Sequence, residues 1–280
     1  MAPRMAPTRS LLCLLAALSG PLVGVASAAE PIQSLDWISD SAQLVITQTH
    51  HITLFEPSTG TAKAFVSPDV DSALSDATLW GAQKHLLIST RADGLFSTAL
   101  AAPNWQPLNQ GLDTQNLDFV FTNVAVTDIL YAANQTSVYK YTPEDQWLNM
   151  DGGPGGVVTD YLHSDMPDSM DTGWIFATGQ TGIAFTADCF CFWRDVKDMS
   201  DGFLALAYQP EEPSWYYAAT ATTLFQTQDG ARTWQPITTV PDNATTALVS
   251  GPMGTLYLGT ASGQLWSFNS ANNDWVKVYE

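Results

Sequence analysis

Short apolar runs recur along the chain at a nearly constant interval, and each is followed by a second apolar segment and then a large aromatic residue. In the clearest copy, Trp215–Thr220 has the length and composition of a buried strand and Thr223–Gln226 is its hairpin partner. Asp229-Gly230 then signals a turn, because Gly tolerates a positive φ and the Asp side chain accepts backbone N–H groups. Trp234 closes the unit, and this order of features can be laid along the chain six times.

Two aromatic markers keep the same spacing through these copies. The second apolar segments carry Phe55, Phe96, Tyr139, Phe185, Phe225 and Trp266, and the closing residues are Phe65, Trp105, Trp147, Trp193, Trp234 and Trp275. Successive members of both sets are 40 to 46 residues apart. A further apolar run, such as Phe203–Ala207, precedes most copies, so each unit offers four strands. Units of this size are typical of β-propeller blades, because a small sheet covers both its faces only when neighbours pack around a ring.

We therefore predict an all-β fold, a six-bladed β-propeller with four-stranded antiparallel blades. The predicted blades span residues 31–67, 74–108, 117–149, 157–197, 202–239 and 245–280. The pattern begins and ends with a complete copy. We expect the ring to close by packing of the first blade on the sixth, with the closing aromatic residues between blades.

Residues 1–28 have a different composition from the rest of the chain. Arg4 and Arg9 precede an apolar run over residues 11–25, and Ala-Ser-Ala at residues 26–28 fits a cleavage site. This pattern predicts a signal peptide and export, either to a periplasm or out of the cell. No other stretch approaches the roughly 20 apolar residues of a spanning helix, so we expect no membrane span.

The chain is strongly acidic, with 10 Lys and Arg against 28 Asp and Glu. Without the two arginines of residues 1–28 the balance is 8 − 28 = −20. Nucleic acid is a poor partner, because phosphate neutralisation needs Lys and Arg. The surface suits a basic protein partner or cations, and we expect a monomer.

The segment from Thr227 to Trp234 resembles an Asp-box (BNR) repeat, whose pattern is roughly Ser/Thr-x-Asp-x-Gly-x-Thr-Trp. Ala231 stands at the usual Gly position. Asp-box propellers include sialidases and sortilin-type receptors, and the chain is most similar to the photosystem II stability/assembly factor-like group of bacterial propellers. The resemblance implies that Asp229, Gly230 and Trp234 are structural. It also implies that ligands bind on the opposite face, which is built by the loops between blades and the links between second and third strands.

Acidic side chains dominate these predicted loops and links. The binding-face candidates are His50, His51, Arg91, Asp93, Asp69, Asp71, Asp113, Asp160, His163, Asp198, Asp201 and Asp242. Together they predict an acidic docking surface, while no catalytic residue or metal-ligand set can be assigned. Cys189 and Cys191 lie where a turn is expected, and a local disulfide and two thiols both stay open.

Two hydrolase classes compete with a binding scaffold. A sialidase-like site needs an arginine triad for the substrate carboxylate, but the residues after the leader hold only Arg91, Arg194 and Arg232, and Arg232 lies in the Asp-box. A calcium-dependent lactonase-type site needs six to eight oxygen ligands, and the acidic loops show no fixed ligand spacing. The sequence therefore favours an exported, non-enzymatic binding or assembly scaffold. Calcium is the one cofactor left open, and the hydrolases are the alternative.

Overall fold

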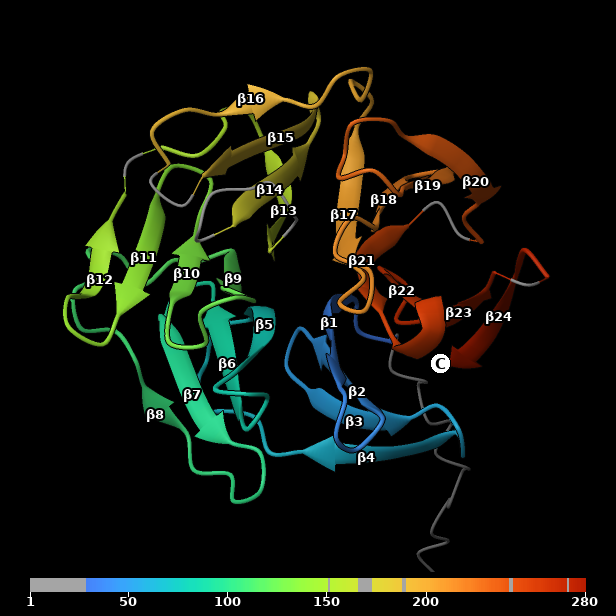
Figure 1. Ribbon diagram of the computed structural model, residues 1–280. Coiled ribbons are helices and arrows are strands. Elements are labelled where there is room, and N and C mark those ends of the chain that lie inside the picture. Colours follow the sequence, from blue (N-terminus) through green and yellow to red (C-terminus); the bar gives the residue numbers. More distant parts are fainter. Residues whose placement is uncertain (1–28, 151, 166–172, 188–189, 242–243, 271) are drawn as a thin grey trace, which may run out of the picture.

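The predicted strands form six separate sheets that stand in a ring (Figure 1). A computed structural model describes residues 29–280 apart from 151, 166–172, 188–189, 242–243 and 271. Each sheet contains four antiparallel strands in chain order, so the all-β, six-bladed propeller is confirmed. The predicted signal peptide lies outside the described residues. Within the described residues, no helix has the length and hydrophobicity to cross a membrane.

The strands are short and evenly distributed. Blades one to three contain β1 Ile32–Ile38, β2 Gln43–Gln48, β3 Ile52–Glu56, β4 Thr61–Phe65, β5 Leu74–Trp80, β6 His85–Thr90, β7 Leu95–Ala99, β8 Gln106–Pro107, β9 Phe119–Thr122, β10 Leu130–Ala133, β11 Val138–Thr142 and β12 Gln146–Asn149. Blades four to six contain β13 Val158–Ser164, β14 Trp174–Gly179, β15 Gly182–Ala187, β16 Arg194–Asp195, β17 Phe203–Tyr208, β18 Tyr216–Thr220, β19 Thr223–Thr227, β20 Gln235–Thr239, β21 Thr245–Ser250, β22 Leu256–Thr260, β23 Leu265–Asn269 and β24 Asp274–Tyr279. One 3-10 turn, η1 Pro252–Gly254, interrupts the strands of blade six.

Burial explains why the second strand of each blade is the clearest sequence signal. Every residue of β10, β18 and β22 is buried, so these strands read as continuous apolar runs. The outermost strands β8 and β16 are exposed throughout and carry no such pattern.

The core lies between blades. Each hydrophobic cluster joins two neighbours, as where Phe203 and Tyr216 of blade five pack against Phe176 of blade four. Stacking of this kind covers both faces of every sheet, which no blade achieves alone.

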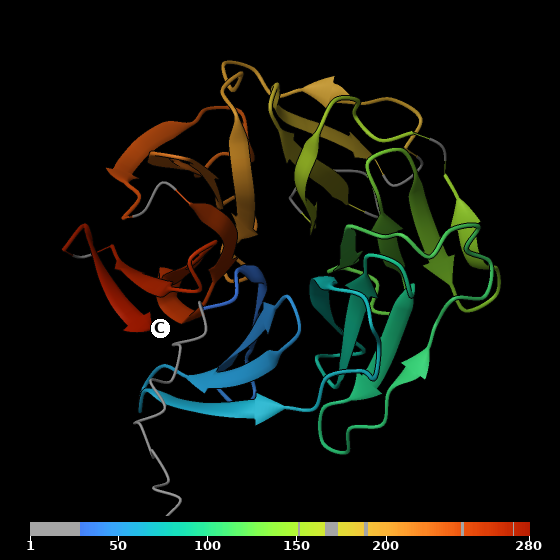
Figure 2. The same cartoon turned by 180° about the vertical axis from the view of Figure 1, so that it is seen from behind.

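The ring closes by packing of blade one against blade six, whose strands lie side by side in Figure 2. Trp37 of β1 stacks on Tyr257 of β22, with ring centroids 5.9 Å apart. Ile32 also lies against Gly259, where an added Cβ would come within 2.6 Å of the isoleucine Cγ2. The closing interface therefore depends on glycine for its close approach.

Four of the closing tryptophans donate a hydrogen bond to a carbonyl of the preceding blade or of the loop that follows it, whereas the indole N–H of Trp234 is buried without a partner among the described residues. The indole N–H of Trp147 donates to the Leu108 carbonyl at 2.8 Å, and that of Trp275 donates to the Thr239 carbonyl at 3.0 Å. Trp105 and Trp193 make the equivalent bonds to the carbonyls of Val66 and Gly152. The burial of these tryptophans varies, since Trp147 is only 2% exposed whereas Trp275 is partly buried.

Candidate functional site: the loop face and the central cavity

One end of the ring carries both the loops between blades and the links between second and third strands, and we call this end the loop face. Backbone hydrogen bonds hold the two kinds of segment together. The Leu74 N–H donates to the Thr49 carbonyl at 2.8 Å, and the Leu117 N–H donates to the Thr90 carbonyl at 3.1 Å. Loops of adjacent blades therefore form one continuous surface.

Most predicted binding-face residues lie on this face. They are His50, His51, Asp69, Asp71, Arg91, Asp93, Asp113, Asp198 and Asp201. Asp242 lies outside the described residues, as does Cys189, so a Cys189–Cys191 disulfide and two thiols both remain open.

Asp160 and His163 do not lie in a loop, because β13 already begins at Val158. His163 is buried, stacks on Tyr131 at 5.9 Å and accepts the Val124 N–H through Nδ1 at 3.1 Å. It packs inside the ring instead of contributing to the acidic surface. Asp160 faces the central cavity described below.

The two adjacent histidines share a carboxylate. Glu30 Oε1 lies 3.1 Å from Nδ1 of His50 and 3.9 Å from Nε2 of His51, and Glu30 Oε2 accepts the His50 backbone N–H at 2.9 Å. Partial burial alone would raise the pKa of Glu30, but these hydrogen bonds and the neighbouring imidazoles lower it overall. The histidines lie in a turn, which lets both rings reach one acceptor.

Several charged loop residues are engaged within the protein. Arg91 pairs with the buried carboxylate of Asp118, and Asp93 accepts the Ser72 N–H at 3.1 Å. Asp113 accepts the Tyr139 hydroxyl, and this hydrogen bond lowers the pKa of its carboxyl. These charged side chains therefore hold the loops in place through hydrogen bonds and ion pairs, in addition to giving the surface its charge.

A second set of acids points outward. Asp69, Asp71, Asp198 and Asp201 are exposed. Within the described part of the chain, Asp198 has only a 3.9 Å ion pair to the neighbouring Lys197. The loop face therefore presents carboxylates that remain available to a partner.

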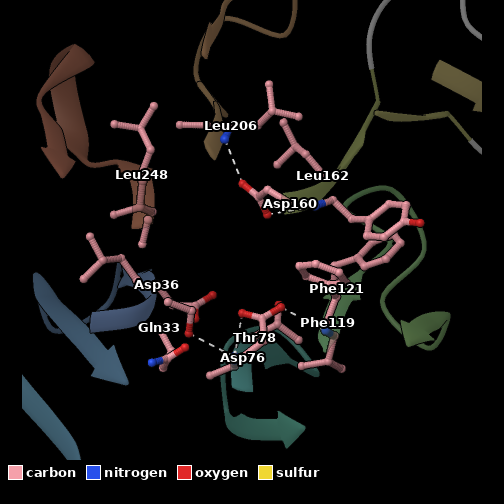
Figure 3. Close-up of a pocket in the computed structure, with 18 of the residues that line it drawn as sticks. Gln33, Asp36, Asp76, Thr78, Phe119, Phe121, Asp160, Leu162, Leu206 and Leu248 are labelled. Carbon is pink, nitrogen blue, oxygen red and sulfur yellow. Dashed lines mark hydrogen bonds between the residues drawn. The ribbon is translucent and has the colours of Figure 1, made fainter. Parts of the chain in front are cut away.

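The axis of the ring holds a cavity of about 500 Å³. It is lined by the first strand of every blade and extends from Arg91 and Gln135, near the loop face, to Ser39 and Pro210 at the other end. Figure 3 shows carboxylates from three of these strands, those of Asp36, Asp76 and Asp160, pointing into the same space.

Each of these carboxylates also accepts a backbone N–H from the next blade, and for Asp36 the donor is Leu79. Asp76 Oδ2 accepts the Val120 N–H at 2.9 Å, and Asp160 Oδ2 accepts the Leu206 N–H at 2.7 Å. The Ser34 hydroxyl oxygen accepts the Ala77 N–H at 3.0 Å at the equivalent place between blades one and two. We call these contacts the inter-blade latches.

Burial strongly raises the pKa values of the cavity carboxyls. It raises the pKa of Asp36 to about 7, although a hydrogen bond from the Leu79 backbone opposes the shift. Burial likewise raises the pKa of Asp160 to about 7, against the hydrogen bonds from Leu206 and Tyr161. The pKa of Asp76 rises well above its usual range because the charges of Asp160 and Asp36 add to burial.

Sequence reasoning missed Asp36 and Asp76. A signal for Asp76 was present, because Asp76 and Asp160 stand at the same place in their strands, each just after a bulge that follows Leu74 or Val158. Among the described residues, no group of three His, Cys, Asp or Glu side chains is placed to hold a metal ion.

The box-like turn of blade five has a well-defined hydrogen-bond set. Asp229 Oδ1 accepts the N–H groups of Arg232 at 3.1 Å and Thr233 at 2.9 Å, and Gly230 has a φ of 70°. Partial burial would raise the pKa of Asp229, but its hydrogen bonds lower it overall. The turn lies between β19 and β20, at the end of the ring opposite the loop face.

No protein-family model and no curated protein matches this sequence. Among solved structures, an extracellular domain assigned to a one component system of B. thetaiotaomicron is similar over 90% of this chain, with a TM-score of 0.61 and 11% identity. This chain spans 33% of the length of that protein. Virginiamycin B lyase from Staphylococcus aureus is similar over 90% of this chain and 85% of its own, with a TM-score of 0.61 and 10% identity.

A chain of the mitotic checkpoint complex matches 97% of this chain and 88% of its own length, with a TM-score of 0.54 and 12% identity. Similarity at these low identities shows a common propeller fold, and it gives no basis for assigning the activity of these proteins to this chain.

Proposed function

We propose that this protein is an exported, non-enzymatic binding scaffold whose acidic loop face docks a basic protein segment or cations. The observation that carries the proposal is the exposed set of Asp69, Asp71, Asp198 and Asp201, which lie in the loops before blades two and five at the same end of the ring. Complementary charge speeds the encounter of such a surface with a basic partner and sets its salt dependence.

Two finer features belong to the same proposal. Export is supported by the leader pattern of residues 1–28 and by the extracellular domain among the structural neighbours. Membership of the Asp-box group, near the photosystem II factor-like propellers, is supported by the hydrogen bonds that Asp229 accepts in its turn.

The test measures binding of a fluorescent lysine-rich peptide by anisotropy at several salt concentrations. Charge reversal of Asp69, Asp71, Asp198 and Asp201 to Lys should weaken binding and flatten its dependence on salt. A matched control reverses four exposed acids at the opposite end of the ring, Asp40, Asp128, Glu144 and Glu212, with the same change in net charge. Equal losses in both variants would show that total charge, and not the loop face, drives capture.

The hydrolase alternative is assayed on the same preparation. Purified protein is incubated with sialosides and lactones, with and without calcium. If the protein turns over one of these substrates and loses that activity when the loop acids are changed, the scaffold hypothesis is rejected in favour of a hydrolase.

A further inference from the structure

Within the described part of the chain, no Lys or Arg pairs with the cavity carboxylates of Asp36, Asp76 and Asp160. Arg91 is the one Lys or Arg among the lining residues, and its guanidinium pairs with Asp118. His163 uses Nδ1 to accept the Val124 N–H and stacks on Tyr131. Within the described residues, the lining carboxyls of Asp36, Asp76 and Asp160 form no ion pair with Lys, Arg or His.

These three carboxyls come from three different strands, β1, β5 and β13. Within the described residues no three such ligands share a metal position. They still interact, because the charge of Asp160 raises the pKa of both Asp36 and Asp76. A cation with several charged groups can pair with acids on different strands, whereas a single calcium ion needs its ligands together, at about 2.3–2.6 Å.

The cavity wall also keeps unused hydrogen-bonding capacity. Asp36 Oδ2 and the Thr246 hydroxyl are buried and have no hydrogen-bond partner in the described structure. A carboxylate offers about four acceptor sites, so the latch bonds of Asp76 and Asp160 leave room for more donors.

Apolar side chains fill the space between the acids. Figure 3 shows Phe119, Leu162 and Leu248 around the same space as the carboxylates. The volume of about 500 Å³ lies within the range of small-molecule sites. Carboxylates separated by apolar side chains are complementary to an aliphatic polyamine, in which methylene groups separate the ammonium groups.

We propose that the central cavity binds a small organic polycation, an aliphatic di- or triamine whose ammonium groups pair with Asp36, Asp76 and Asp160. The three acids lie on strands inside the ring and are not among the exposed acids of the loop face, so this proposal is tested independently of the docking function.

Isothermal titration calorimetry with spermidine in 0.15 M salt tests the site. We expect one spermidine per protein, with affinity reduced about tenfold or more in Asp36→Asn and in Asp160→Asn, as expected for losing a hydrogen bond between charged groups. Asparagine keeps a carbonyl oxygen that can accept the Leu79 N–H at position 36 and the Leu206 N–H at position 160, so these variants should remain folded, which circular dichroism verifies. Butylamine and calcium should bind far more weakly than spermidine.

The control variant carries Asp69→Asn and Asp71→Asn on the loop face. It should bind spermidine as the unmodified protein does. The proposal is overturned if spermidine does not bind, if the cavity variants keep full affinity, or if the loop-face control loses as much as they do.

The pH dependence of spermidine affinity supplies a second test. Other ionisable groups that line the cavity are Asp118, Arg91, His163, Tyr161 and Tyr208. Because a carboxyl must release its proton to pair with an ammonium group, affinity should rise between pH 6 and 8. Asp160→Asn should flatten that rise, and an unchanged pH profile in this variant would count against the site.

Discussion

Trp147 is the closing residue on which the ring should depend most. Its side chain is 2% exposed and packs with Leu117, Leu130 and Tyr141, and its indole N–H donates to the Leu108 carbonyl at 2.8 Å. Trp147→Ala removes this packing and leaves the carbonyl without its donor. Truncation of a buried Trp costs about 3–5 kcal/mol, and we expect the upper part of that range because the hydrogen bond is lost as well.

Two companion variants separate packing from hydrogen bonding. Trp147→Phe keeps most of the buried ring and loses the N–H, so it should cost about 1–2 kcal/mol. Trp275→Ala removes the same kind of bond, to the Thr239 carbonyl, from a residue that is only partly buried. Its cost should be about half that of Trp147→Ala, because less apolar surface is returned to water.

Urea unfolding followed by far-ultraviolet circular dichroism measures these differences, since it does not depend on the tryptophan that is removed. Free energies are compared only between variants with equal dependence on urea. Trp147→Ala costing no more than Trp275→Ala would refute the argument that closing residues act through burial between blades.

Two further predictions concern the ring interior. Gly259→Ala should destabilise the protein by about 1–3 kcal/mol, since its Cβ would overlap Ile32 at the closing interface, whereas Gly152→Ala, which meets no atom within 4 Å, should be nearly neutral in the same urea assay. Burial raises the pKa of Asp160 to about 7 when folded, so between about pH 4 and 7 the folded state binds more protons than the unfolded state, and this residue's contribution to stability falls as pH rises through that window. Comparing unfolding at pH 5 and pH 8 should show a smaller loss in Asp160→Asn than in the unmodified protein, and equal losses would argue against a raised pKa.

The architecture was predictable because its main signals are local and repeated. Strands such as β10 and β18 are buried on both faces and give unbroken apolar runs, and the aromatic markers repeat them at a steady period. The outermost strands β8 and β16 are two residues long and exposed, so periodicity alone could not locate them.

The loop-face residues were also placed by topology, since antiparallel strands fix which connections share an end. The cavity was harder to foresee. Asp36 sits between Leu35 and Trp37, and an acid in such a run reads as a solvent-facing position of an amphipathic strand. In the ring that position faces the axis. It lines a cavity instead of facing open solvent only because all six blades surround it.

The ring axis offers a physical reason for acids within otherwise apolar strands. The first strand of each blade is the inner edge of its sheet, and an edge strand has N–H groups without a partner in the sheet. At the equivalent positions Ala77, Val120 and Leu206, the N–H is accepted by Ser34, Asp76 and Asp160 of the preceding blade. Serine at one of these positions shows that an acceptor oxygen is sufficient for the latch. A carboxyl at the other two positions exceeds what the latch requires, and a cationic ligand in the cavity would use its capacity to ionise.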